Sequence, residues 1–122
     1  MPPRPSTAAV TARIRALCLA LPEATERESH GEAAWFVRKA PQFATMSDHH
    51  HDDRVAVWVA APPGAQADWV AKDAQRYFVP PYVGGRGWIG VYLDAEPDWD
   101  AIADIVEDGF RTVAPRKLID RL

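Results

Sequence analysis

Two short stretches of the chain alternate strictly between side chains that would face opposite sides of a sheet. In residues 55–60, valine occupies every odd position, and alanine or tryptophan occupies every even one. In residues 87–93, the odd positions from 89 onward are aliphatic, and two aromatic residues lie on the opposite side, Trp88 and Tyr92. A period of two predicts β-strands, and both stretches are expected to be strands of one sheet.

Two further runs, residues 34–38 and 42–47, also have the composition of strands. A turn at Ala40-Pro41 separates them, and the polar connection 48–53 leads to the valine-rich run. Connections this short favour an antiparallel meander. The polar segment 23–32, which precedes these strands, is expected to be a loop.

Apolar residues at helical spacing predict three helices. Residues 1–5 are proline-rich and expected to be disordered; Ser6 or Thr7 then caps the first helix, which Pro22 ends. Its apolar stripe is Val10, Ile14, Leu17 and Leu21. The second helix has one face formed by Ala67, Val70, Ala71 and Ala74. The third starts at the N-cap Asp98, and its stripe is Ile102, Ile105, Val106, Phe110 and Val113.

The segment 77–88 is expected to form an edge strand and a reversal before the last strand. Pro80 and Pro81 cannot donate to a sheet ladder, which restricts them to an edge. Gly84 and Gly85 are assigned the positive φ angles of a tight turn, so that the loop displays Arg86. All elements together predict an α+β two-layer sandwich with a single antiparallel β-sheet and helices on one face. The whole chain, residues 1–122, is expected to be one domain.

Composition narrows the function classes only modestly. The chain has 122 residues, of which 48% are hydrophobic and 25% charged, as in ordinary globular proteins. No apolar run approaches the roughly 20 residues that span a membrane. The only cysteine, Cys18, lies beside the first apolar stripe, where a buried structural thiol is expected. A single cysteine fits a reducing cytoplasm, and the net charge of −3 gives no global attraction to polyanions.

Two motifs resemble known sites without their required context. Residues 85–90 match G-x-G-x-x-G, but the match leads into a strand, whereas dinucleotide binding needs a helix N-terminus there. His49, His50 and His51 are consecutive on one polar loop, and ligands so close in sequence rarely converge on a metal. No serine or cysteine lies in a nucleophile context. We therefore expect no cofactor, no metal site and no enzymatic activity.

Side chains of two kinds remain as candidates for binding. If the aliphatic residues of the last strands face the helices, then Trp58, Trp88 and Tyr92 share the opposite face, which is open to solvent in a two-layer fold. Alternatively, these rings pack on one another or under loops. The tail is acidic from Asp94 to Asp108 and mainly basic beyond, which indicates either complementarity to helix dipoles or a basic corner for an anionic partner.

Several short motifs are distinctive in combination: Leu21-Pro22-Glu23, Ser29-His30-Gly31, Trp35-Phe36, Ala61-Pro62-Pro63-Gly64, the run from Tyr77 to Trp88, and the run from Val113 to Leu118. On these residues the chain resembles the MmcQ/YjbR-like family over nearly its whole length. The resemblance implies an α-β(3)-α-β(2)-α fold, like that of secretion chaperones. It also implies a DNA-binding role through wing-like hairpins.

The sequence thus predicts a cytoplasmic, non-enzymatic DNA-binding-like protein whose binding is weak and indifferent to DNA sequence. The residues expected to meet phosphates are Arg38, Lys39, Arg86, Arg111, Arg116 and Lys117. The alternative is a protein- or small-ligand-binding module with an exposed aromatic sheet face, formed by His30, Trp58, Trp88 and Tyr92. In either case we expect a monomer or weak homodimer with no membrane partner.

Overall fold

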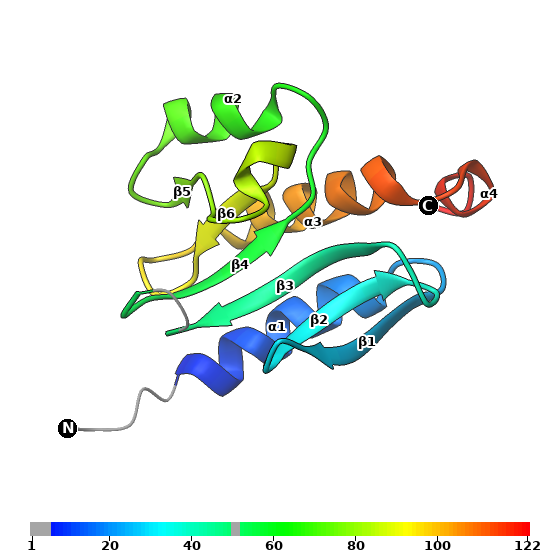
Figure 1. The fold of residues 1–122 in the computed structure, drawn as a ribbon, viewed down its shortest axis with the longest axis horizontal. Helices are drawn as coiled ribbons and strands as arrows, with labels where there is room; N and C mark the ends of the chain where they lie inside the picture. Colours follow the sequence, from blue (N-terminus) through cyan, green and yellow to red (C-terminus); the bar gives the residue numbers. More distant parts are fainter. Residues whose placement is uncertain (1–5, 50–51) are drawn as a thin grey trace.

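The computed structural model describes residues 6–49 and 52–122. Four strands precede the second helix and two follow it (Figure 1). The elements are α1 (Ser6–Leu19), β1 (Ala24–Ser29), β2 (Glu32–Val37), β3 (Gln42–Asp48), β4 (Val55–Val59), α2 (Ala65–Lys72), β5 (Tyr77–Phe78), the 3-10 helix η1 (Gly84–Arg86), β6 (Ile89–Tyr92), α3 (Trp99–Val113) and α4 (Arg116–Ile119). The predicted lead-in, residues 1–5, lies outside the described residues.

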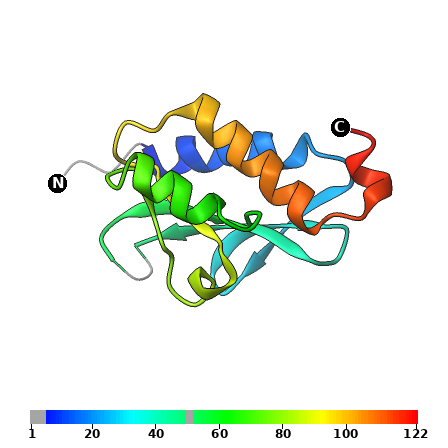
Figure 2. The same cartoon turned by 90° about the horizontal axis from the view of Figure 1, so that it is seen from above.

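One antiparallel sheet holds all six strands, in the order β1-β2-β3-β4-β6-β5. Helices α1 and α3 lie side by side against one face of this sheet, and α2 packs at the β5–β6 end (Figures 1 and 2). The predicted α+β class with a single antiparallel sheet is confirmed. The opposite face of the sheet, which carries neither α1 nor α3, is called the open face below.

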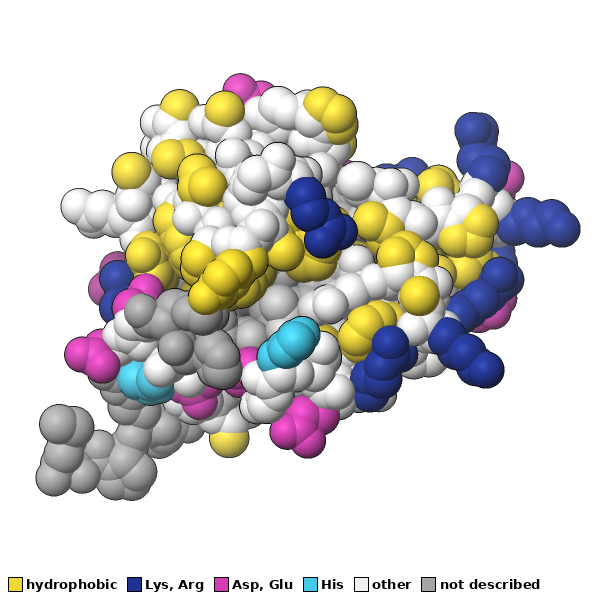
Figure 3. All heavy atoms as spheres, in the orientation of Figure 1, with side chains coloured by type: hydrophobic (Ala, Val, Ile, Leu, Met, Phe, Trp, Pro, Cys, Tyr) yellow, Lys and Arg dark blue, Asp and Glu magenta, His cyan; other side chains and the backbone are white. Residues whose placement is uncertain are grey.

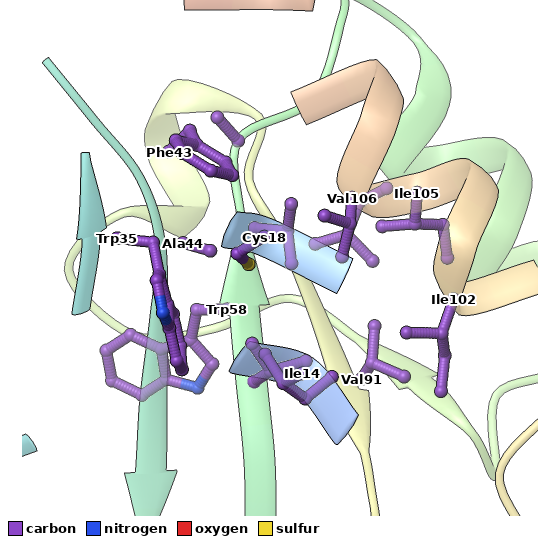
Figure 4. Close-up of a cluster of buried hydrophobic side chains, with 14 of the residues drawn as sticks. Ile14, Cys18, Trp35, Phe43, Ala44, Trp58, Val91, Ile102, Ile105 and Val106 are labelled. Atoms are coloured by element: carbon purple, nitrogen blue, oxygen red, sulfur yellow. The ribbon is translucent and has the colours of Figure 1, made fainter. Parts of the chain in front are cut away.

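The core lies between the sheet and the helix pair α1 and α3 (Figure 4). Ile14 and Cys18 of α1 are fully buried, as is Phe110 of α3, whose ring meets the edge of Phe43 with centroids 5.7 Å apart. Burial raises the pKa of the Cys18 thiol far above its ordinary value, so the predicted structural thiol is confirmed as buried and unreactive. At the start of α3, Asp98 accepts a hydrogen bond from the Ala101 amide, as its N-cap assignment predicts.

One predicted loop is a strand. Residues 23–32 contain β1, which pairs with β2 along its whole length. Four strands, instead of three, therefore precede α2. The polar composition was misleading, because β1 is an edge strand with alternating half-buried and exposed side chains. Its half-buried Glu26 accepts hydrogen bonds from the Trp35 indole (2.8 Å) and from Arg15 on α1 (2.7 Å). The family order α-β(3)-α-β(2)-α therefore gains one strand here.

The predicted inner face of the second helix is also wrong. Of its four residues only Val70 is half-buried and packs on the core, whereas Ala67, Ala71 and Ala74 are exposed; the main contact of α2 is the half-buried Trp69. The Trp69 ring lies 5.0 Å from that of Tyr77 on β5. Helix α2 has only eight residues and packs mainly through the Trp69 ring. Its small alanine side chains bury too little apolar area to provide this contact.

The reversal between β5 and β6 uses different residues from those predicted. Gly84 and Gly85 do not have positive φ; they form η1, and the left-handed residues are Tyr82 (φ 63°) and Gly87 (φ 85°). Gly84 is needed for space, because a Cβ there would lie 2.6 Å from Val79 Cγ1. After this reversal β6 pairs with both β4 and β5; the predicted strand is confirmed and lies in the interior of the sheet.

Candidate ligand cleft on the open face

A cleft of about 590 Å³ opens on the face of the sheet away from α1 and α3. Its floor comes from β3 and β4, one wall from the β1–β2 hairpin, and the other from the segment 82–88, which contains η1. Figure 3 views this face and shows the hollow between the hairpin and η1. The side chains that bear on its chemistry are Ser29, His30, Glu32, Thr45, Ser47, Trp58, Tyr82, Arg86 and Trp88.

The strand register explains why Trp58 lies in the floor. Trp58 pairs with Thr45 on β3 and with Gly90 on β6, so these three residues point to the same face. Gly90 leaves space there, because a Cβ would lie 2.3 Å from the Phe78 ring. The Phe78 ring therefore lies over Gly90, next to Trp58.

The predicted exposure of the aromatic face is wrong. Trp58 is 9% exposed and Trp88 4%, so both indoles are buried and only their edges reach the cleft. Tyr92 does not line the cleft at all: its ring stacks on Phe78 with centroids 4.3 Å apart, and the Arg54 guanidinium lies 3.7 Å from its centroid. Of the four residues in the aromatic alternative, His30, Trp58 and Trp88 come together, and Tyr92 lies apart from them.

Helix α2 holds the wall that carries Arg86. The Gln66 side-chain amide donates to two carbonyls of this wall, that of Gly84 over 2.9 Å and that of Trp88 over 2.6 Å. These bonds join Gly84, at the start of η1, and Trp88, two residues beyond its end, to one side chain. The Arg86 guanidinium, 5.4 Å from the Trp88 ring centroid, is thus presented from a fixed backbone.

The opposite wall carries a carboxylate. Glu32, at the start of β2, accepts a hydrogen bond from the Asp48 amide over 2.6 Å, which ties the hairpin to the end of β3. His30, next to it in the cleft wall, is exposed and has a positive φ of 53° in the tight hairpin turn. The cleft therefore presents one guanidinium and one carboxylate from opposite walls; its floor contributes the Trp58 indole and the hydroxyls of Thr45 and Ser47, and the wall that carries Arg86 contributes the Trp88 indole.

The sequence argument missed the polar part of this cleft: Ser29, Glu32, Thr45, Ser47 and Tyr82. One signal was available. Thr45 and Ser47 are two residues apart on a largely buried strand, so both side chains point to the open face, while those of Ala44 and Met46 point to the helices. Polar residues on one side of an interior strand indicate a solvated or ligand-facing surface.

The predicted phosphate-binding residues divide between two places. Lys and Arg side chains gather at the end of the molecule formed by α4 and the β2–β3 turn (Figure 3). By their positions in the chain, Arg38 and Lys39 lie in the β2–β3 turn, and Arg116, Lys117 and Arg121 lie in or just after α4; these five residues are called the basic end below. Arg111 lies in the last turn of α3. Arg86 instead lines the cleft, which Arg116 and Lys117 do not.

Most guanidinium groups of the basic end already have acidic partners. Glu23 accepts hydrogen bonds from Arg38 over 2.8 Å and from Arg121 over 2.7 Å, and Arg116 pairs with Asp120 at 3.0 Å. The Arg38 hydrogen bond, with a smaller contribution from Arg121, lowers the pKa of the exposed Glu23 carboxyl below its ordinary value. Surface pairs of this kind reduce the charge available to an anionic partner.

The histidine loop is only partly described. His49 pairs with the neighbouring Asp48 carboxylate through Nδ1, and His50 and His51 lie outside the described residues. Within residues 6–49 and 52–122, no three His, Cys, Asp or Glu side chains group so as to hold a metal ion. In the same part of the chain, no helix has both the length and the apolarity to cross a membrane.

The fold and cleft define an α+β protein with one antiparallel sheet, whose helix-free face is hollowed to the size of a small ligand. A family model, YjbR, matches residues 19–112, which include every strand and all of α2. The chain therefore belongs to the YjbR family, and the predicted MmcQ/YjbR-like assignment is confirmed. A search of curated proteins finds no match.

Proposed function

We propose that this protein is a non-enzymatic binding module that takes a small molecule into the cleft on its open face. The observation that carries this proposal is the convergence of Trp58, Trp88, Arg86 and His30 on one cavity of about 590 Å³. Cavities of roughly 300–1,000 Å³ lined by aromatic rings and a few polar groups are typical small-molecule sites.

The proposed setting is the cytoplasm. Its support is limited to Cys18, a free and buried thiol in a chain with no second cysteine. Reduced thiols are the rule in that compartment.

A screen of small aromatic compounds by two-dimensional amide NMR tests the proposal. We expect shifts concentrated in β3, in Trp58 and in the segment 82–88. Thr45→Phe places a ring opposite Trp58 and should abolish them. Thr25→Phe, on the same sheet face but outside the cleft, is the matched control and should leave them unchanged. Melting curves establish that both variants fold. Absence of cleft shifts with every compound at millimolar concentration, or shifts that survive in Thr45→Phe, would overturn the proposal.

Weak binding of duplex DNA by the basic end is the second candidate. The gathering of Lys and Arg side chains at the basic end favours it, although Glu23 and Asp120 neutralise part of that charge. We expect a dissociation constant of roughly 10⁻⁴–10⁻⁶ M at physiological salt, the same for every duplex sequence. Each lost phosphate contact should flatten the slope of log K against log salt by about 0.9.

The two candidates are separable because Arg86 lies outside the basic end. Arg116→Ala combined with Lys117→Ala should weaken DNA binding and leave cleft binding intact. Arg86→Ala should have the opposite pattern. Absence of duplex binding at low salt, or binding that the α4 variant does not weaken, counts against the DNA candidate alone.

A further inference from the structure

From the cleft's charges and rings we infer the class of its ligand: a planar aromatic ring that bears a single carboxylate, with the carboxylate on Arg86 and the ring against the indoles of Trp58 and Trp88. This inference rests on the proposed function, since it names the ligand of the same cleft.

The proposal that the ligand contains an aromatic ring follows from the two indoles of the cleft, Trp58 and Trp88, which have little freedom to move. Trp58 belongs to the central strand β4, and Trp88 has its own carbonyl held by Gln66. Buried indoles with fixed backbones present preformed edges to a flat ring, and edge-to-face contact between aromatic rings gains energy beyond simple burial. Tyr82 at the cleft rim is 81% exposed and has a φ of 63°, a conformation that costs a non-glycine residue energy and that concentrates at ligand sites.

The negative charge follows from Arg86. Its side chain is exposed, lies over the Trp88 ring, and forms no ion pair with an acidic side chain among the described residues. Three other arginines lie over rings, and all three are outside the cleft: Arg13 over Trp99, Arg27 over Phe36 and Arg54 over Tyr92. A guanidinium at the edge of an aromatic cavity has the geometry for two parallel hydrogen bonds to a carboxylate.

The limit of one charge follows from Glu32. Its carboxylate faces the same cavity from the opposite wall, and the Asp48 amide hydrogen bond holds it in place. A dianion such as a phosphate monoester could pair one negative charge with Arg86. Its second charge would have no cation to pair with among the described residues of the cleft and would be repelled by the Glu32 carboxylate. The hydroxyls of Ser29, Thr45 and Ser47 remain to hydrogen-bond polar substituents on the ring.

Three matched probes test this assignment: 2-naphthoate, its neutral analogue 2-naphthamide, and the dianion 2-naphthyl phosphate. Affinities are measured by calorimetry, and the site of each by amide NMR. We expect the wild-type protein to bind naphthoate about ten-fold or more tightly than naphthamide, which corresponds to one charge-assisted hydrogen-bonded pair. Naphthyl phosphate should bind more weakly than naphthoate.

Four variants locate the charges. Arg86→Ala should abolish the preference for naphthoate over naphthamide, and Arg86→Lys should restore part of it. Arg27→Ala, a matched arginine over a ring outside the cleft, should change nothing. Glu32→Gln keeps a carbonyl acceptor for the Asp48 amide and should raise the affinity for naphthyl phosphate relative to naphthoate.

The outcomes separate this inference from the proposed function. Equal binding of naphthoate and naphthamide in the cleft would overturn the charge assignment and leave the small-molecule proposal standing. Tighter binding of the phosphate by the wild type would overturn the limit of one charge. If no probe binds in the cleft and the compound screen also fails there, both ideas fall together.

Discussion

The side-chain amide of Gln66 donates to the carbonyl of Trp88 over 2.6 Å, and so joins α2 to the wall of the cleft across 22 residues of sequence. The same amide also donates to Gly84. Gln66 is therefore a positioning residue: it touches no ligand in our proposal, yet it fixes the backbone from which Arg86 and Trp88 project.

Gln66→Ala should lower both stability and cleft binding. Two half-buried carbonyls lose their donor, and we expect a loss of about 1–3 kcal/mol in the free energy of unfolding. Urea titration measures the stability change, and calorimetry with 2-naphthoate measures the binding change. Gln75→Ala is the control, because the Gln75 side chain is exposed and only its backbone is hydrogen-bonded. If Gln66→Ala alters stability without altering affinity, the positioning role is wrong.

Two neighbouring glycines should respond differently to the same substitution. Gly87 has a φ of 85°, so Gly87→Ala places a side chain in the left-handed region at a cost of about 1–2 kcal/mol. Gly85 has ordinary φ, and a Cβ there meets nothing within 4 Å, so Gly85→Ala should be neutral or slightly stabilising. Thermal melts of the two variants decide the point; equal melting temperatures would contradict the turn geometry.

Gly109→Ala should destabilise the protein, against the usual preference of helices. Alanine is favoured over glycine inside a helix by about 1 kcal/mol. At this position, however, a Cβ would lie 2.6 Å from the Ala60 carbonyl oxygen, and a backbone atom cannot move aside as a side chain can. Forcing α3 away from β4 should cost about 1–3 kcal/mol. Urea unfolding of the variant measures this, and a gain in stability would show that α3 can shift freely.

The contribution of Glu26 should depend on pH. Hydrogen bonds from Arg15, and then from Trp35, lower the pKa of this half-buried carboxyl despite the opposing effect of burial. Because its folded pKa is depressed, the stabilisation is complete above the unfolded value of about 4.3 and is lost as pH falls through the folded value.

Glu26→Gln should therefore cost about 1–2 kcal/mol near pH 7, and the difference from wild type should shrink below about pH 4. Denaturant unfolding across this pH range provides the measurement. Glu28→Gln, on the same strand and with no ion pair among residues 6–49 and 52–122, should show no such pH-dependent difference. A gap that stays constant down to pH 3 would assign the effect to packing instead of charge.

Metal should be dispensable for folding. His49 pairs with its neighbour Asp48, and the described residues offer no convergent ligand set. Melting curves recorded with and without EDTA should superimpose. A lower melting temperature in EDTA would reinstate a structural metal site that involves the histidine loop, including His50 and His51.

Local sequence patterns predicted the elements whose own residues contain the signal. The alternation in residues 55–60 and 87–93 predicted β4 and β6, and the stripe from Ile102 to Phe110 predicted α3 with its Asp98 cap. These patterns are reliable because the period of a buried stripe is set by backbone geometry alone. The combination of short motifs likewise predicted the family, which the match over residues 19–112 confirms.

Tertiary structure decided everything that depends on neighbours distant in sequence. The polar strand β1 exists because β2 supplies its hydrogen bonds, and the burial of Trp58 and Trp88 depends on how the segment 79–88 folds back. Arg86 lines a cleft because Gln66 of α2 holds the backbone on either side of it, at Gly84 and Trp88. The hydrophobic pattern of a segment shows whether it forms a helix or a strand, but not which other segments it will contact. A binding site is formed by contacts between such segments.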